Sequence, residues 1–147
     1  MRSIKYIVVH CTGGNPNETI EQLKNGFKAL GWKNNGYHIV VDGKGARHNI
    51  TPLNQIANGV AGHNSKSIHV SYMGGKVVKG KPVDTRTEEQ KTELLKILKE
   101  LKKQFPTAVI VGHRDFSADT NKNGVIDHFE WIKACPCFDA KKEYENI

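Results

Sequence analysis

Short runs of β-branched and other apolar residues recur along this chain, separated by polar and glycine-containing stretches. They occupy residues 4–10, 36–41, 46–50, 68–72 and 109–111. Runs of this length and composition, bounded by turn residues, predict β-strands. The second and third runs lie on either side of a Gly-rich turn, which predicts a β-hairpin.

Two longer segments show the pattern of amphipathic helices, in which apolar residues recur every three or four positions. Each begins with a pair of residues that fits a capping box, Thr19 with Gln22 in the first and Thr87 with Gln90 in the second. The first periodic segment ends before Gly31, and the second continues to about residue 105. We therefore predict two substantial helices.

The rest of the pattern completes one α/β domain. Residues 74–84 are rich in Gly and Lys and predict a surface loop, and a short helix is expected from residue 139 onward. Strands that alternate with helices predict an α/β fold with a central mixed β-sheet flanked by helices. The length of 147 residues fits a single domain over residues 1–147.

Composition and charge narrow the function classes. The formal net charge of +7 favours anionic partners. The Lys residues are scattered and no nucleic-acid-binding motif is present, so we do not expect nucleic acid as a partner. No apolar run could span a membrane, and the N-terminus lacks the apolar core of a signal peptide. We expect synthesis in the cytoplasm without a signal peptide and no membrane insertion.

Candidate metal ligands lie at the ends of predicted strands. His10 ends the first strand, His113 follows the last, and Cys135 comes later in the chain. Zinc favours imidazole nitrogen and thiolate sulfur, and a catalytic zinc site has three protein ligands and one open position. These three residues would form such a set, although structural histidines held by hydrogen bonds are the alternative. Strand alternation predicts that Cys11 points away from His10.

Five motifs occur in an order that resembles a known family. They are Val-Val-His10-Cys-Thr, Gly31-Trp32, Asn35-Gly-Tyr37-His-Ile-Val, Val111-Gly-His113-Arg-Asp and Lys133-Ala-Cys135-Pro-Cys-Phe-Asp139. Together they resemble the zinc-dependent N-acetylmuramoyl-L-alanine amidases of the phage-lysozyme and peptidoglycan-recognition-protein family. The resemblance spans almost the whole chain and implies the peptidoglycan-recognition-protein-like amidase fold.

The resemblance implies a set of site residues and a reaction. His10, His113 and Cys135 would be zinc ligands, and Tyr37 and Lys133 would be the catalytic side chains. The implied reaction is hydrolysis of the amide between N-acetylmuramic acid and L-alanine in peptidoglycan. Zinc and Lys133 could stabilise the oxyanion, and Tyr37 could orient water or relay a proton. Which of the two side chains transfers the proton stays open.

The enzyme implied by this resemblance would lyse cell walls, as a phage endolysin or a bacterial autolysin does. It would act on the wall after release or export by another system, and we expect it to act as a monomer. The alternative is a non-catalytic peptidoglycan-binding module, against which the presence of all the implied site residues argues. A third class is regulation by contact with a polymerase, which the sequence does not test.

The sequence departs from the family pattern at Cys137. The two thiols of Cys135-Pro-Cys137 could both reach a metal. A site closed by two His and two Cys ligands would be structural, because it leaves no position for water. We favour the open site, in which Cys135 alone supplies sulfur.

A second departure is the long insertion between His113 and Lys133, which matches the EF-hand calcium template. The predicted oxygen ligands are Asp119, Asn121, Asn123, the Val125 carbonyl, Asp127 and Glu130, with Gly124 at the sharp turn. The alternative is an Asx-rich turn that binds no ion. We expect zinc as the main cofactor and calcium as a second one.

Candidate substrate contacts lie outside the metal-site motifs. His63 and Asn64 form a polar pair on a loop expected to face the site, where they could bind the peptide stem. Arg47 and Arg114 could pair with the carboxylates of the stem. The expected partner is therefore the muramyl peptide of peptidoglycan.

Overall fold

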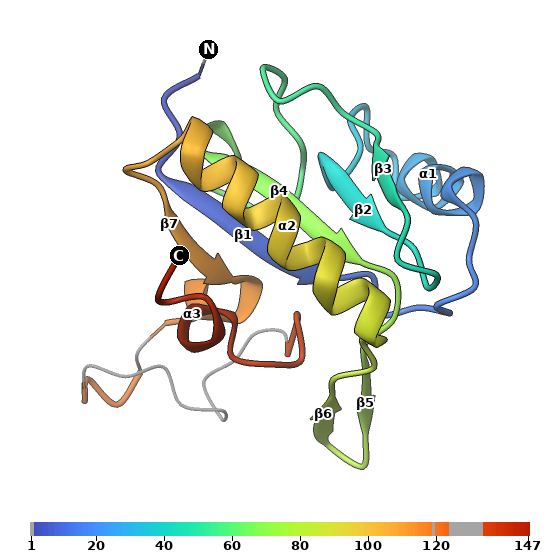
Figure 1. The fold of residues 1–147 in the computed structure, drawn as a ribbon. Coiled ribbons are helices and arrows are strands. Elements are labelled where there is room, and N and C mark those ends of the chain that lie inside the picture. Colours follow the sequence, from blue (N-terminus) through green and yellow to red (C-terminus); the bar gives the residue numbers. More distant parts are fainter. Residues whose placement is uncertain (1, 119, 124–133) are drawn as a thin grey trace.

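The computed structural model describes residues 2–118, 120–123 and 134–147, and its centre is a five-stranded sheet (Figure 1). The strand order is β3-β2-β4-β1-β7. In chain order these strands are β1 (Tyr6–Cys11), β2 (Ile39–Val41), β3 (Arg47–Asn49), β4 (Ser67–Tyr72) and β7 (Val109–Gly112). The predicted strands are thus confirmed, with shifted ends.

The sheet is mixed, as the sequence predicts. Strand β1 pairs in parallel with both β4 and β7, and β2 pairs in parallel with β4. Strands β2 and β3 pair antiparallel and form the predicted hairpin. Because β1 is flanked by two parallel strands, its carboxyl end lies beside the carboxyl ends of β4 and β7.

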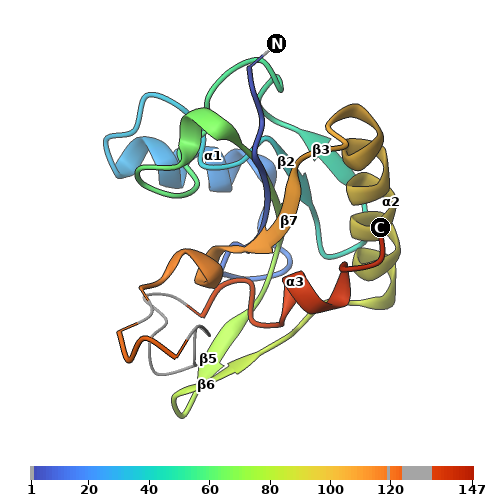
Figure 2. The same cartoon turned by 90° about the vertical axis from the view of Figure 1, so that its left-hand side faces the viewer.

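Two helices cover opposite faces of this sheet. Helix α1 (Ile20–Ala29) packs on one face and α2 (Glu88–Gln104) on the other, as the two views show (Figures 1 and 2). Both predicted capping boxes are present at the helix starts. A short helix, α3 (Ala140–Glu143), follows the last strand and contacts β7. Within the described ranges no helix is long and apolar enough to cross a bilayer.

The prediction of a surface loop over residues 74–84 is wrong. This segment forms a small antiparallel hairpin of β5 (Lys76–Val78) and β6 (Lys81–Val83), which projects from the body of the protein (Figure 1). Lys79 and Gly80 connect the strands with φ angles of 50° and 77°. Positive φ at both turn residues suits the right-handed twist of a two-residue hairpin, which explains why a Gly-containing turn joins two strands here.

Alternation along β1 assigns its side chains to two environments. Ile7, Val9 and Cys11 belong to the main core beneath α2, together with Leu94 and Leu98 of that helix. The intervening residues point to the opposite face, where Val8 packs with Val60 and Val111. His10 follows Val8 on that face, at the edge of the sheet where the strands end.

Candidate metal centre

Two histidines meet at the carboxyl edge of the sheet. His10 lies near the end of β1, and His113 begins a 3-10 helix, η2 (His113–Phe116), directly after β7. The parallel register places Val9 opposite Gly112, so the next residue of each strand lies at the same edge. The ring centroids of the two histidines are 4.9 Å apart.

The third candidate ligand, Cys135, is held at this edge by backbone hydrogen bonds. The Arg114 N–H donates to the Cys135 carbonyl at 2.9 Å, and the Cys11 N–H donates to the Cys135 sulfur at 3.1 Å. The Tyr72 hydroxyl donates to the carbonyl of Pro136 at 2.6 Å. These contacts join the segment that carries Cys135 to β1, β4 and the start of η2.

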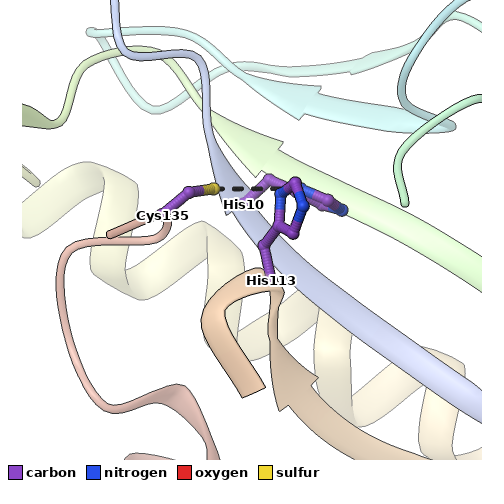
Figure 3. Close-up of side chains that lie close together, drawn as sticks. All are labelled: His10, His113 and Cys135. Carbon is purple, nitrogen blue, oxygen red and sulfur yellow. Dashed lines mark hydrogen bonds between the residues drawn. The ribbon is translucent and has the colours of Figure 1, made fainter. Parts of the chain in front are cut away.

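The three side chains converge on one point (Figure 3). One ligand atom from each of His10, His113 and Cys135 lies within 4.8 Å of the others. The distance from His10 Nδ1 to Cys135 Sγ is 3.8 Å. His10 is buried, whereas the other two residues are partly exposed. Two imidazoles and one thiol are a donor set that fits zinc, and partial exposure leaves one side of the group open.

The other two thiols lie close to each other and line the same cavity as the candidate ligands. The sulfur atoms of Cys11 and Cys137 are 3.9 Å apart, and both residues are buried in the main core. Cys137 Sγ also lies 3.7 Å from the Lys76 carbonyl oxygen. A hydrogen bond with Cys135 and burial raise the pKa of Cys11, and burial raises the pKa of Cys137 to about 11. Among the described residues, the group whose ligand atoms lie close enough to share a metal is His10, His113 and Cys135.

The candidate ligands line a cavity of about 300 Å³ that also contains Tyr37. The ring of Tyr37 lies 5.1 Å from the ring of His10, and its hydroxyl donates to the Cys11 carbonyl at 3.3 Å. Burial raises the pKa of the Tyr37 phenol well above its ordinary value. The phenol therefore keeps its proton at neutral pH and can act as a hydrogen-bond donor.

A second cavity, of about 500 Å³, adjoins the first. The residues that line both cavities are Trp32, Asn58, Gly59 and His113. His63 and Asn64 line the second cavity, so the structure brings this predicted pair beside the site. The His63 ring packs against Phe116 with 4.4 Å between ring centroids.

Two further histidines lie behind His10 and are fully buried. His69 Nδ1 is 2.9 Å from His10 Nε2, and the His69 backbone N–H donates to His38 Nδ1 at 3.0 Å. Burial lowers the pKa of His69 to about 3 and that of His38 to about 4. Both rings are therefore neutral at physiological pH.

The two predicted arginines differ in position. Arg114 lies in η2 directly after His113. Arg47 lies on β3 and pairs with two carboxylates of α2, Glu93 at 2.8 Å and Glu100 at 2.5 Å. Because α2 covers the opposite face of the sheet from the cavity, the structure does not bring Arg47 to the site.

Several predicted residues lie outside the described ranges. Lys133 is one of them, and so are four of the predicted calcium ligands, which are Asp119, Val125, Asp127 and Glu130. Two further calcium candidates are described, and the Asn123 N–H donates to Asn121 Oδ1 at 3.2 Å. The catalytic role of Lys133 and the calcium site stay predictions.

Sequence reasoning missed some residues that shape the site. His69 is one, although β4 pairs in register with β1, with Val8 opposite His69. Residues at paired positions share a face of the sheet, so this register indicates that His69 lies on the same face as His10. Lys76 and Val77 of the β5–β6 hairpin also line the first cavity, which the prediction of a loop did not indicate.

Known proteins are similar to this chain over most of its length. A family model described as N-acetylmuramoyl-L-alanine amidase matches residues 1–125. The endolysin of Klebsiella phage KP32 is 30% identical over 142 residues, which cover 95% of this chain and 85% of the endolysin.

Solved structures confirm the predicted fold class. The Ph2119 endolysin from Thermus scotoductus MAT2119 bacteriophage Ph2119 has a TM-score of 0.69 and 26% identity, over 91% of this chain and 77% of that one. The amidase LysC from Clostridium intestinale URNW has a TM-score of 0.74 and 20% identity, over 97% of this chain and 82% of that one. This second likeness concerns the fold alone.

Proposed function

The chain belongs to the N-acetylmuramoyl-L-alanine amidase family, and we propose that it cleaves peptidoglycan with a zinc ion held by His10, His113 and Cys135. The bond cut is the amide between N-acetylmuramic acid and L-alanine. The observation that carries the zinc assignment is the convergence of three ligand atoms within 4.8 Å at the wall of a cavity. The endolysin relatives support action on the cell wall after release.

The donor set determines what a bound metal could do here. A zinc ion supplies Lewis acidity, which polarises an amide carbonyl and lowers the pKa of a coordinated water. Two neutral imidazoles and one thiolate leave part of the metal's positive charge uncompensated. The partly exposed side of the group faces the cavity, where a substrate carbonyl could approach.

Tyr37 is the described side chain best placed to assist at the reacting carbonyl. Its hydroxyl contacts the Cys11 carbonyl at the edge of the same cavity. A protonated phenol can turn its O–H toward an oxyanion that develops beside the ligand group, where a fixed donor stabilises the transition state more than the ground state. We assign Tyr37 this donor role.

Lys133 keeps its predicted role as the second catalytic side chain. An ammonium group would stabilise the same oxyanion by charge, or would carry the proton to the leaving amine. The proposal for Lys133 rests on its place in the Lys-Ala-Cys135 motif.

The two adjoining cavities suit a substrate with a sugar and a peptide. We propose that the muramyl peptide lies across both, because they share Trp32 and Asn58. His63 in the second cavity offers an imidazole to polar groups of the substrate, and Arg114 offers charge to a stem carboxylate. Arg47 is left out, because its guanidinium is engaged by α2.

The decisive experiment is digestion of purified peptidoglycan sacculi by the full chain. Zinc-loaded protein should release new L-alanine amino termini, and a chelator should stop the release. Adding zinc back should restore the release of these termini. If zinc-loaded protein releases no such termini, the hydrolytic assignment fails. If chelation leaves the release unchanged, zinc dependence alone fails.

We also propose that the insertion before Lys133 binds calcium and makes the segment that carries Cys135 more rigid. The support is the match of residues 119–130 to the EF-hand template. A melting curve of zinc-loaded protein in millimolar calcium should shift upward relative to one in magnesium. An unchanged curve would contradict the proposal.

A further inference from the structure

His10 uses both ring nitrogens, and they face different partners. Its Nδ1 lies 3.8 Å from the Cys135 sulfur, on the side of the ligand group. Its Nε2 lies 2.9 Å from His69 Nδ1, in the interior. His10 is 1% exposed and His69 is 0% exposed. The second contact is therefore a buried hydrogen bond whose direction decides which His10 nitrogen carries the proton.

The direction of that bond can be derived from the next residue in the hydrogen-bonded series, which is Asn64. Asn64, at the start of η1 (Asn64–Lys66), places its Oδ1 2.8 Å from the Val60 backbone nitrogen. A backbone N–H can only donate, so this side-chain atom is the amide oxygen. The same oxygen lies 2.9 Å from His69 Nε2. An amide oxygen can only accept, so His69 Nε2 must carry a proton.

The proton on His69 Nε2 determines the direction of the hydrogen bond between His69 and His10. A neutral imidazole has one N–H and one acceptor nitrogen, and a fully buried ring favours the neutral form. His69 Nδ1 is then an acceptor, so His10 Nε2 must donate to it. His10 in turn carries its lone pair on Nδ1, the nitrogen that faces Cys135.

The surroundings hold the His69 ring in this orientation. Gly59 lies against the ring so closely that a Cβ atom at residue 59 would collide with it. The His38 ring is stacked with the His69 ring, with 5.9 Å between centroids and 12° between planes. The His69 backbone N–H is bonded to the same His38. The ring has little freedom to turn and exchange its two nitrogens.

We propose that Asn64 and His69 are positioning residues that fix His10 in the tautomer whose Nδ1 binds zinc. This inference rests on the proposed zinc site. It gives Asn64 a different role from the substrate contact predicted by the sequence, and it gives His69 a role that the sequence did not predict. In metal sites generally, the hydrogen bond on the non-ligating nitrogen of a histidine orients the ring and raises its basicity. Here a second imidazole, itself held by an amide, makes that bond.

The first test is the zinc affinity of two variants, measured by competition with a chromogenic chelator. His69→Leu removes the acceptor and should weaken zinc binding by about 10–100-fold, the usual effect of losing such a partner. His69→Asn can place an amide oxygen near the position of Nδ1 and should restore most of the lost affinity. Melting curves of the metal-free variants show whether each is folded.

A matched control removes an imidazole elsewhere. His48 bonds Asp42 at 2.8 Å on the β2–β3 hairpin, and His48→Leu should leave zinc affinity unchanged. If His69→Leu binds zinc as tightly as this control, the inference fails while the zinc site stands. If the wild-type chain binds no zinc, the proposed zinc dependence fails instead.

The second test needs no variant. Nitrogen-15 NMR of the metal-free wild-type protein, above neutral pH, can report which nitrogen of each histidine carries the proton. His10 and His69 should both be protonated on Nε2. A His10 protonated on Nδ1 would overturn the inference, whatever the zinc affinity proves to be.

Discussion

Three cysteine side chains lie beside the candidate metal centre, yet their sulfur atoms have different neighbours. The Cys135 sulfur faces His10, whereas those of Cys11 and Cys137 face each other in the main core. Cys137 has a φ angle of 70°, which is uncommon for a residue with a side chain. That backbone conformation belongs to the turn after Cys135, in which the Cys137 N–H donates to the Ala134 carbonyl.

Serine substitutions at the two positions should therefore have opposite outcomes. Cys135→Ser removes the thiolate ligand and should abolish both bound zinc and amidase activity. Cys137→Ser should keep both, because its sulfur lies outside the ligand group. Zinc content by atomic absorption, with release of L-alanine termini, measures the two effects. Loss of zinc from both variants would indicate a four-ligand site and contradict the open one.

At Tyr37, removal of a single oxygen tests the donor role. Tyr37→Phe should lower kcat by about 100–1,000-fold, the usual effect of losing one oxyanion donor. Bound zinc should stay at the wild-type level, because the phenol is not in the ligand group. The measurement is the rate of sacculus digestion at saturating substrate.

Tyr144→Phe is the matched control for that substitution. Its hydroxyl accepts a hydrogen bond from Arg86 in the main core, away from the cavity. This variant should digest sacculi at close to the wild-type rate. Equal losses of rate in the two tyrosine variants would mean that Tyr37 acts through stability.

The site residues whose positions follow from the local sequence could be predicted. Those whose positions depend on contacts between distant segments could not. The sequence predicts His10 and His113, because His10 lies near the end of one strand, His113 directly follows another, and the ends of these strands share a sheet edge. It does not reveal that His69 supports His10, since that contact needs the register of β1 against β4. The sequence also does not predict the position of Arg47, because this residue forms ion pairs with carboxylates of α2 that lie far along the chain.

At the scale of elements, the start of α2 is tied to the sheet by its capping box. Thr87 Oγ1 accepts from the Gln90 N–H at 3.1 Å, and Gln90 Oε1 accepts from the Thr87 N–H at 2.9 Å. The buried Gln90 also donates to the Met73 carbonyl at 2.9 Å, just after β4. One polar cluster thus caps the helix and anchors it to the sheet.

Thr87→Ala should lower the free energy of unfolding by about 1 kcal/mol, since it leaves the Gln90 N–H without its cap. Thr92→Ala is a matched control in the same helix, where an exposed Thr donates to the Glu88 carbonyl. It should be neutral or slightly stabilising, because Ala favours helix. Urea unfolding followed by circular dichroism measures both. A larger loss at Thr92 would contradict the capping argument.

The elements with strong local signals were predicted well, and the weak one was not. Both long helices begin where their capping boxes indicate, because the cap and the apolar stripe agree. The β5–β6 hairpin was missed because its strands are short, largely exposed and rich in Lys, which is also typical of a loop. The strands are defined instead by their pairing with each other.

On the scale of the whole molecule, the candidate metal centre joins three separate parts of the chain. His10 comes from β1, His113 from the start of η2 directly after the edge strand β7, and Cys135 from the segment that leads into α3. Arg86 strengthens the last attachment, because its guanidinium lies 3.5 Å from the Phe138 ring centroid and pairs with Glu143. A metal bound to all three parts favours the folded state over the unfolded one.

Removal of zinc should therefore lower the melting temperature. A ligand at 100 times its dissociation constant contributes about 2.7 kcal/mol, which for a chain of this size corresponds to roughly 5–10 °C. Calorimetry of the zinc-loaded protein before and after chelation measures the shift. Cys135→Ser should show no shift on chelation, which separates loss of bound zinc from other effects of the chelator.

The distance along the chain between the ligands has a consequence during synthesis. His10 and Cys135 are separated by 125 positions, so the ligand group cannot form until residue 135 has left the ribosome. The strands of the sheet and both long helices precede that residue. A nascent chain can thus fold most of its body while it still lacks a ligand. If the proposed zinc site is the catalytic one, activity requires residue 135, and a message broken upstream of that codon should yield a protein without hydrolytic activity.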